Sequence, residues 1–370
     1  MPVLDLQVLQ ENIGEEPLTA QPDESAPRKL TMRSPDEILA MQFDDSDIIL
    51  GDRLLADGQP LVIAGQGGAG KTRFVLQLVA CIVAKRKFLA LETGKPALRW
   101  LILQTENSNR RLQSDLARLK SWLADDWQRF TDQVTIHTLE NDTDGFVSLE
   151  SLENQNAIQA AIEATAPDVI VIDPLNDFAA GDLNKDVDMK VTLQTLSRLC
   201  RRGNPHRAII LVHHALTGRG GAVKATGYDR SSFARNSKTL HAWARGQINL
   251  APVDPDSNER LIVACGKCSN GREFPTFAIR LNPDTLIYEC DPTVDVSQWE
   301  RDVAGQSDRG PLMTPERVAE LCQPLTKKPD LAKAIMADCG CAKGSAYRYI
   351  TRATGRTIKH NKSDDTYSRK

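Results

Sequence analysis

Apolar positions in residues 60–214 follow two alternating patterns. Short continuous apolar runs recur, and a longer stretch with apolar residues at helical spacing follows each of the first four. The runs cover 60–65, 99–105, 133–139, 168–173 and 207–214, and the stretches cover 72–84, 106–123, 151–165 and 188–202. Continuous apolar strands between amphipathic helices predict a parallel sheet that is covered by helices on both faces.

The pattern changes after residue 245. Four apolar segments, at 247–253, 260–266, 276–281 and 285–290, follow one another with only short polar stretches between them. Such spacing is typical of antiparallel strands. We therefore predict an α/β fold in which a mostly parallel sheet, with helices on both faces, carries an antiparallel extension.

Polar segments divide the chain into parts. Residues 1–33 are polar and acidic without a sustained period, and we expect a disordered or interaction arm there. The α/β pattern defines a domain over 34–290, and a polar linker is expected over 291–312. Residues 313–370 contain three short helical segments and then two strand-like pieces, an order that resembles a winged helix-turn-helix domain.

Composition narrows the function classes. The formal net charge is -3, so the chain as a whole is not a basic nucleic-acid binder. No apolar run approaches the roughly 20 residues that span a bilayer, and no signal peptide is visible, which favours a cytoplasmic protein with reduced thiols. The cysteine pairs 265/268 and 339/341 leave a zinc site open as an alternative, but their spacing favours small buried thiols.

Charge is distributed unevenly along the chain. From Gly340 to the C-terminus, eight Lys/Arg and two Asp give +6, so the remainder carries −9. This asymmetry indicates a C-terminal DNA-binding domain that contacts duplex DNA, although a protein-docking winged helix with a solvated basic face stays open. The expected DNA-contacting residues are Lys343, Tyr347, Arg348, Arg352, Lys359 and Lys362.

A glycine-rich segment between the first strand and the first helix fits the pattern GxxxxGK[ST]. Glycines allow consecutive backbone N–H groups to surround a phosphate, and the helix that follows directs its positive end at the same anion. Lysine in this pattern reaches the β- and γ-phosphates of ATP, and the hydroxyl residue binds Mg²⁺. The predicted nucleotide-binding residues are Gly65, Gln66, Gly67, Gly68, Ala69, Gly70, Lys71 and Thr72.

Polar residues at the ends of later strands suggest the rest of the site. Asp173 closes the apolar run 168–173, a position from which an Asp holds Mg²⁺ in P-loop proteins. Glu106 ends the next strand after the P-loop helix, where it either positions the attacking water or only starts a helix. The pair His213-His214 ends the run 207–214, where a polar side chain either senses the γ-phosphate or has a core or capping role.

Together these segments resemble the RecA-like P-loop ATPases and, within them, the RepA-type hexameric replicative helicases of plasmids. The resemblance covers about 50–281 and rests on GGAGKT, LQTENSNRRL, VIDPLNDF, LVHHALTG, FARNSKTLHAWARGQINL and CGKCSNG. It implies that Glu106 is catalytic, that Asp173 is at the metal position and that His214 is the γ-phosphate sensor.

The last two segments resemble those that reach the nucleotide of a neighbouring subunit. The resemblance implies an arginine finger at Arg245, a second basic residue at Arg235 and a further contact from Lys267. The related proteins often have a basic residue two positions after that lysine, where this chain has Ser269, so Arg245 is the main finger candidate. An arginine supplied by a neighbour makes hydrolysis depend on assembly into a ring.

Polar loops at 181–190 and 218–230 follow the Asp173 and His214 strands. In RecA-like rings, the loops at these places line the channel and touch single-stranded DNA. Arg219, Lys224 and Arg230 are therefore expected to contact DNA phosphates, with a merely solvated loop as the alternative.

The sequence thus favours an Mg²⁺- and ATP-dependent DNA helicase or translocase that forms a homo-oligomeric ring, as a hexamer by resemblance. Its tail would suit replication of a plasmid, phage or other mobile element. Two alternatives remain open because P-loop chemistry is shared among them. One is a nucleotide-gated DNA-binding regulator or assembly ATPase that does not unwind DNA, and the other is a recombination ATPase.

Overall fold

The computed structural model describes residues 31–43, 47–141, 144–145, 147–234, 238–305, 313–339 and 343–370. The chain divides into two compact units, Met1–Asp45 and Ser46–Lys370. In the first unit, α2 (Pro35–Leu39) begins with a capping box: the Glu37 backbone N–H donates to the Ser34 side chain at 3.2 Å, and the Ser34 N–H donates to the Glu37 carboxylate at 2.6 Å.

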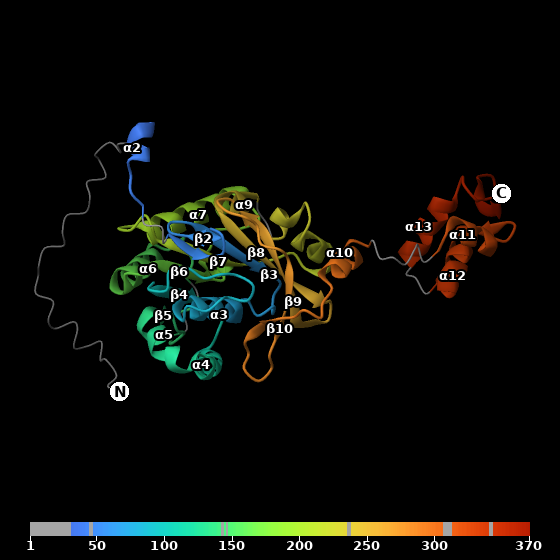
Figure 1. Cartoon of the computed structure of the whole chain (residues 1–370). Helices are drawn as coiled ribbons and strands as arrows, with labels where there is room; N and C mark the ends of the chain where they lie inside the picture. Colours follow the sequence, from blue (N-terminus) through green and yellow to red (C-terminus); the bar gives the residue numbers. More distant parts are fainter. Residues whose placement is uncertain are drawn as a thin grey trace, which may run out of the picture. The chain divides into compact units, whose positions relative to one another are not determined.

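A nine-stranded sheet organises the second unit, with strand order β11-β10-β9-β8-β3-β7-β6-β4-β5 (Figure 1). The strands from β8 to β5 in this order are parallel, and β9, β10 and β11 add antiparallel to the edge at β8. The sheet strands are β3 (Pro60–Gly65), β4 (Trp100–Gln104), β5 (Val134–Ile136), β6 (Val169–Asp173), β7 (Ala208–His214), β8 (Gly246–Asp254), β9 (Ser257–Cys268), β10 (Phe277–Leu281) and β11 (Tyr288–Cys290). The predicted parallel sheet with an antiparallel extension is confirmed.

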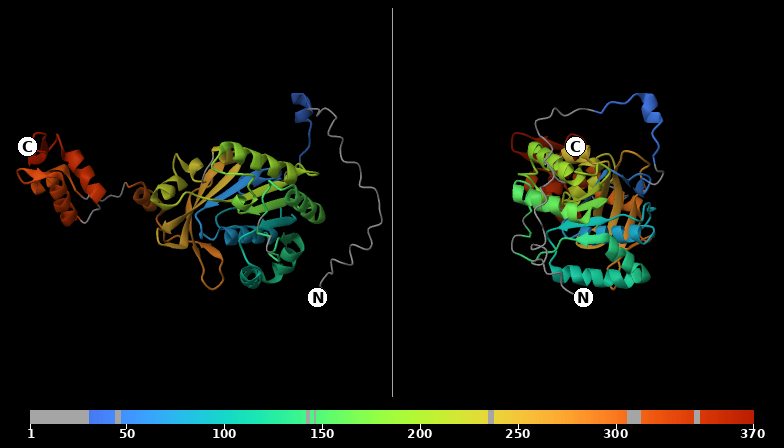
Figure 2. Two further views of the ribbon diagram at one scale, coloured as in Figure 1. Left: turned by 180° about the vertical axis from the view of Figure 1, so that it is seen from behind. Right: turned by 90° about the vertical axis from the view of Figure 1, so that its left-hand side faces the viewer.

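Helices cover both faces of this sheet, as the apolar strands require (Figure 2). Side chains of β3 alternate between the faces: Ile63 belongs to the core under α3, α4 and α5, and Val62 to the core under α6 and α7. The helices of this unit's α/β part are α3 (Lys71–Val83), α4 (Asn109–Leu123), α5 (Trp127–Gln133), α6 (Leu152–Thr165), α7 (Asp186–Arg201), α8 (Gly218–Ala222), α9 (Lys238–Trp243) and α10 (Val296–Ala304). The short elements are β1 (Ile48–Leu50), β2 (Leu55–Ala56), η1 (Ala124–Asp126), η2 (Leu175–Phe178), η3 (Val223–Ala225) and η4 (Arg230–Ser232).

The structure differs from the expected linker at α10. Asp295 caps this helix by accepting a hydrogen bond from the Gln298 N–H at 2.9 Å. Trp299 is buried in the core that includes α6 and α7, and its indole N–H donates to the Val253 carbonyl at 3.2 Å. The one buried aromatic residue in a polar sequence therefore extends the folded part of the chain to at least Ala304.

Residues 313–370 form a small three-helix arrangement with a three-stranded antiparallel sheet in the order β12-β14-β13. Its elements are α11 (Pro315–Leu321), β12 (Thr326–Lys327), α12 (Lys328–Cys339), α13 (Lys343–Ala353), β13 (Ile358–Asn361) and β14 (Thr366–Arg369). A core of its own, including Val318, Leu331, Ile350 and Tyr367, holds these elements together. The three expected helices and two expected strands are present, and the sequence missed only the short β12.

Within the described residues, no helix has the length and apolar character needed to cross a bilayer.

Candidate nucleotide site

The glycine-rich loop joins β3 to α3 at the carboxyl end of the sheet. Gly68 and Gly70 have φ of 75° and 71°, values that L side chains rarely adopt. A Cβ at Gly70 would also collide with the Tyr288 hydroxyl, which donates to the Ala69 carbonyl at 3.3 Å. Tyr288 is itself held by Gln77, because its backbone N–H donates to Gln77 Oε1 at 2.7 Å and its carbonyl accepts from Gln77 Nε2 at 2.8 Å. The antiparallel extension therefore supports the phosphate loop from below.

Lys71 lies at the start of α3 with its ammonium group turned back over the loop. Its Nζ donates to the Gln66 carbonyl at 2.9 Å and lies 3.4 Å from Nδ1 of His214. Burial lowers the pKa of Lys71, and the nearby carboxylates of Asp173 and Glu106 oppose that shift. The cation is thus desolvated beside a loop of backbone N–H groups, an arrangement suited to the charge of a phosphate chain.

Thr72 and Asp173 meet although 101 positions separate them in the chain: Thr72 Oγ1 donates to Asp173 Oδ2 at 2.6 Å. Asp173 is only 3% exposed, and burial raises its pKa to about 6. Glu106 and Asp177 raise this pKa further, whereas the Thr72 hydrogen bond and Lys71 lower it. A hydroxyl and a buried carboxylate are hard oxygen donors, and a divalent cation would relieve the cost of burying that charge, so the pair fits Mg²⁺.

A metal site built from protein groups alone is not present among the described residues: no three His, Cys, Asp or Glu side chains gather there in a way that could hold an ion. Mg²⁺ in phosphate sites usually needs only one or two protein carboxylates, because phosphates and water complete its shell. Burial raises the pKa of Cys265 to about 11, as expected for an inert thiol.

Glu106 and His214 form the far side of the site. Glu106 follows β4, its side chain is 51% exposed, and its Oε1 lies 3.9 Å from Nε2 of His214. His214 ends β7, whereas His213 points into the sheet and is buried. His214 therefore lies between the Glu106 carboxylate and the Lys71 ammonium, and the structure brings together the four side chains expected at the γ-phosphate end, including Asp173.

Sequence reasoning missed Asn107. This residue is buried, and its amide nitrogen lies 3.5 Å from Thr72 Oγ1. Gln104 fixes its orientation through two contacts, of Oε1 with the Asn107 N–H at 2.8 Å and with the side-chain amide at 3.3 Å. A polar residue directly after a buried strand end was the available signal.

Arg245 and Lys267 lie at the opposite end of the sheet. Arg245 precedes β8 and its backbone N–H donates to the carbonyl of Pro60, the first residue of β3. Six residues of strand separate that point from Gly65, so a distance of roughly 16 Å lies between the two ends. Lys267 pairs with Gln247 across β8 and β9, and its Nζ donates to the His241 carbonyl at 2.7 Å. Arg235 lies outside the described residues.

The loop 218–230 is tied to its own domain. Arg219 donates from Nη2 to the Asp302 carbonyl at 2.6 Å and from Nε to the Val303 carbonyl at 3.1 Å, which caps the end of α10. Arg230 pairs with Glu273 at 2.6 Å. Lys224 is half-buried, and the sequence missed Tyr228, which is fully exposed in the same loop.

Buried amides connect this loop to β8. Asn249 Nδ2 donates to the Ala225 carbonyl at 2.9 Å and to the Arg230 carbonyl at 3.0 Å. Gln247 donates to Asn249 Oδ1 at 2.8 Å and reaches the Arg230 carbonyl at 3.3 Å. Gly266 faces both amides, and a Cβ there would collide with them. The strand that begins beside Arg245 thus holds the loop through a fully buried polar network.

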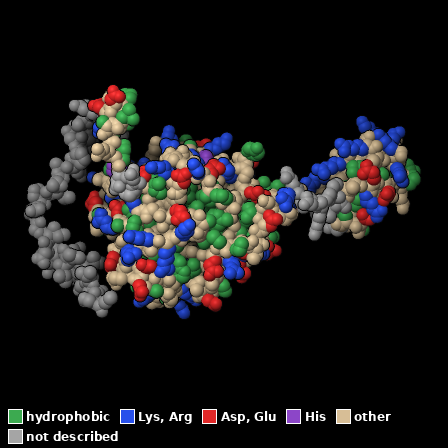
Figure 3. Space-filling model, viewed as in Figure 1, with side chains coloured by type: hydrophobic (Ala, Val, Ile, Leu, Met, Phe, Trp, Pro, Cys, Tyr) green, Lys and Arg blue, Asp and Glu red, His purple; other side chains and the backbone are tan. Residues whose placement is uncertain are grey.

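The expected DNA contacts of the C-terminal module lie on α13, on β13 and in the turn after β13. Arg348, Arg352, Lys359 and Lys362 are exposed, and Figure 3 shows Lys and Arg side chains over the visible face of this module. Tyr347 carries two cations over its ring, Lys343 at 5.9 Å and Lys328 at 5.6 Å, of which the sequence missed Lys328.

Comparisons with known proteins match this chain in the following way. A sequence profile described as an AAA domain matches residues 28–220, slightly more than half of the chain. No curated protein sequence matches. Two solved structures are similar: a KaiC-like protein from the hyperthermophilic archaeon Pyrococcus horikoshii OT3 (16% identity, TM-score 0.42, 64% of this chain and 91% of that chain) and the ATPase domain of a second protein (15% identity, TM-score 0.43, 63% and 85%).

Proposed function

The chain belongs to the AAA domain family, and from that premise we propose that it is an ATP-hydrolysing, ring-forming DNA helicase or translocase, acting in replication of a plasmid, phage or mobile element. One observation carries the proposal. The phosphate-binding residues and the cationic residues expected at the same nucleotide lie at opposite ends of β3. One chain therefore supplies two incomplete halves, and a ring of copies makes each site whole.

In the half that holds the nucleotide, Lys71 neutralises the β- and γ-phosphates, and Thr72 and Asp173 hold Mg²⁺. Bound Mg²⁺ would offset negative charge on the phosphates. Glu106 is exposed enough to meet water, and its carboxylate accepts a proton from the attacking water or orients it. His214 lies between Glu106 and Lys71, where a γ-phosphate would change its contacts.

In the other half, Arg245 is the residue that reaches the neighbour. It is exposed, and its own phosphate loop is too distant for it to act within one chain. Lys267 is fixed by the His241 carbonyl beside it, and burial together with the Arg245 charge lowers the pKa of Lys267. An arginine that completes the site from a neighbour stabilises the charge of the transition state.

DNA contact is proposed at the loop 218–230 and follows from the amides of β8. Asn249 and Gln247 hold the carbonyls of this loop, and Arg245 precedes the same strand. A change at the neighbour's nucleotide that moves Arg245 would therefore also move the loop. Tyr228 adds an exposed aromatic ring on which a base of single-stranded DNA can stack.

The C-terminal module is proposed to be a winged helix that binds duplex DNA through α13 and the β13–β14 hairpin. Its exposed basic residues and the cation-flanked ring of Tyr347 support a phosphate-binding surface. A protein-docking role remains the competing explanation of the same surface.

A second function is favoured by the contacts of Arg219 and Arg230. Both guanidinium groups are engaged inside the domain, so the loop has fewer free cations than a strand-gripping loop would need. This arrangement suits a nucleotide-gated ATPase that assembles on duplex DNA through the C-terminal module without unwinding it.

ATP hydrolysis by the purified chain, alone and with single-stranded or duplex DNA, tests the choice when mass photometry is performed on the same samples. Stimulation by single strands together with a ring of six subunits is the expected result. Stimulation by duplex alone, or DNA-bound assemblies with little turnover, would instead favour the non-unwinding ATPase. A monomer with full turnover would contradict the shared site.

A further inference from the structure

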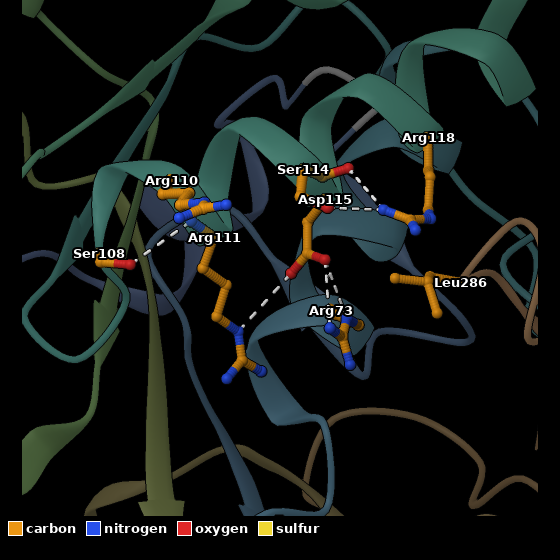
Figure 4. Close-up of a pocket in the computed structure, with 8 residues that line it drawn as sticks. All are labelled: Arg73, Ser108, Arg110, Arg111, Ser114, Asp115, Arg118 and Leu286. Carbon is orange, nitrogen blue, oxygen red and sulfur yellow. Dashed lines mark hydrogen bonds and ion pairs between the residues drawn. The ribbon is translucent and has the colours of Figure 1, made fainter.

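A second cationic pocket lies outside the residues used above, between α4 and the first turn of α3. Its volume is about 580 Å³, and four arginines and two serines line it together with Asp115 and Leu286. Figure 4 shows the side chains of α4 along one side of this pocket and Arg73 of α3 opposite them. The proposed hydrolysis needs none of these residues.

The pocket has an excess of positive charge. Its only carboxylate, Asp115, is held by Arg73, whose Nε and Nη2 both lie 3.2 Å from Oδ1, and by Arg111 at 3.9 Å. Arg118 donates from Nη1 to the Ser114 hydroxyl at 2.6 Å, a neutral partner on its own helix. Four guanidinium groups and one carboxylate leave a charge of +3 at the pocket.

The cations of α4 are arranged in a line. Arg110, Ser114 and Arg118 are four positions apart, so they lie on successive turns of one helix face. A rise of 1.5 Å per residue places the first and last about 12 Å apart. Ser108 caps the helix by accepting from the Arg111 N–H at 3.4 Å, so the positive end of the helix also faces this region.

We propose that this pocket binds the phosphate backbone of a nucleic-acid strand, at a site separate from the loop 218–230 and from the C-terminal module. Arginine, serine and a helix N-terminus are the groups that contact nucleic-acid phosphates. A line of about 12 Å spans three or four phosphates of one strand, at about 3.4 Å of axis per phosphate in B-DNA. One small phosphate group would leave most of the line without a partner.

An acidic peptide suits the pocket less well. Peptide recognition normally adds apolar anchors or backbone pairing along a sheet edge. Here Leu286 is the only apolar lining residue, and the cations come from two helices whose backbone groups are already bonded. Guanidinium groups spaced along a helix match evenly spaced phosphates.

The test uses the full chain with Arg110→Gln and Arg118→Gln combined. Both side chains are exposed and neither contacts Asp115, so the ion pairs that join α3 to α4 remain. The matched control combines Arg99→Gln with Arg202→Gln, which removes the same charge from exposed positions outside the pocket. Anisotropy of a labelled oligothymidine is measured against salt, without nucleotide and with a non-hydrolysable ATP analogue.

The double variant is expected to bind the oligonucleotide about tenfold more weakly and to reduce the salt slope by about 1.4, because each lost phosphate contact in single strands contributes about 0.7. The control should keep the wild-type affinity and slope. Hydrogen exchange in 109–123 should slow with the oligonucleotide in wild type and not in the double variant.

Three results would overturn the proposal. Equal slopes for the double variant and wild type would show that no strand lies in the pocket. A loss of ATP affinity with unchanged DNA binding would assign the pocket to the nucleotide. Retained DNA binding with weaker binding of polyglutamate would assign it to an acidic protein. Each result leaves the proposed ATPase intact, since Lys71→Ala tests that separately.

Discussion

The two ends of β3 differ in how their functional side chains are held. At the carboxyl end, Lys71, Thr72, Asp173 and His214 are buried or half-buried and in contact with one another. At the amino end, Arg245 is exposed and only its backbone is fixed. A group that must bind phosphate within its own chain is preorganised there, whereas a group that serves a neighbour needs a fixed backbone and a free side chain.

Loss of Lys71 should have the largest effect on this comparison. Lys71→Ala removes the buried cation from the phosphate loop, so nucleotide binding is expected to disappear. Calorimetric titration with ATP measures it, and Lys85→Ala, which changes a lysine after α3, is the control. Nearly unchanged ATP affinity would remove the loop from its assigned role.

Loss of Arg245 should stop turnover from the other end. Arg245→Ala is expected to lower kcat by roughly 10³-fold or more, as for arginines supplied in trans, while ATP still binds. Mixing this variant with Lys71→Ala subunits should restore part of the activity, because each supplies the half that the other lacks. If no ratio restores activity, Arg245 does not act on a neighbour.

Glu106→Gln should come next in size. The amide cannot accept the proton of the attacking water, so kcat is expected to fall roughly 10²- to 10⁴-fold with ATP affinity retained. Glu153→Gln, at an exposed position on α6, is the matched control. Single-turnover hydrolysis measures the chemical step, and retained turnover would take Glu106 out of catalysis.

The smallest effect concerns stability. The folded-state pKa of Asp173 is about 6, above the ordinary value of 3.8, so the folded chain holds this proton more tightly than the unfolded chain. Its contribution to the free energy of unfolding therefore falls as pH rises from about 4 to about 6. Asp173→Asn should stabilise the metal-free protein at pH 8 by at most about 3 kcal/mol.

Urea unfolding with EDTA at pH 4 and pH 8 measures this difference. The variant and wild type should agree more closely at pH 4, where the carboxyl is protonated in both folded and unfolded chains. Mg²⁺ with ATP should stabilise wild type at pH 8 and not Asp173→Asn. A variant that is less stable than wild type at pH 8 would contradict the buried-charge explanation.

The sequence alone was sufficient for the elements and much of the site. Uninterrupted apolar runs such as 168–173 can only be buried on both faces, so they required a helix-covered parallel sheet. Glycines before Lys71 predicted the phosphate loop, because few other residues permit its backbone. Asp173 and His214 were identifiable because carboxyl ends of parallel strands meet at one edge.

Tertiary structure decided what local patterns leave open. Asn107 and Tyr288 joined the site through contacts with Thr72 and Ala69, which no spacing encodes. Arg219 capped α10 and Trp299 extended the core into the expected linker, because both depend on partners distant in sequence. Sequence determines which side chains need burial, a helix end or a phosphate; only the packed chain determines which of them meet, because strand order and register bring distant residues to one place.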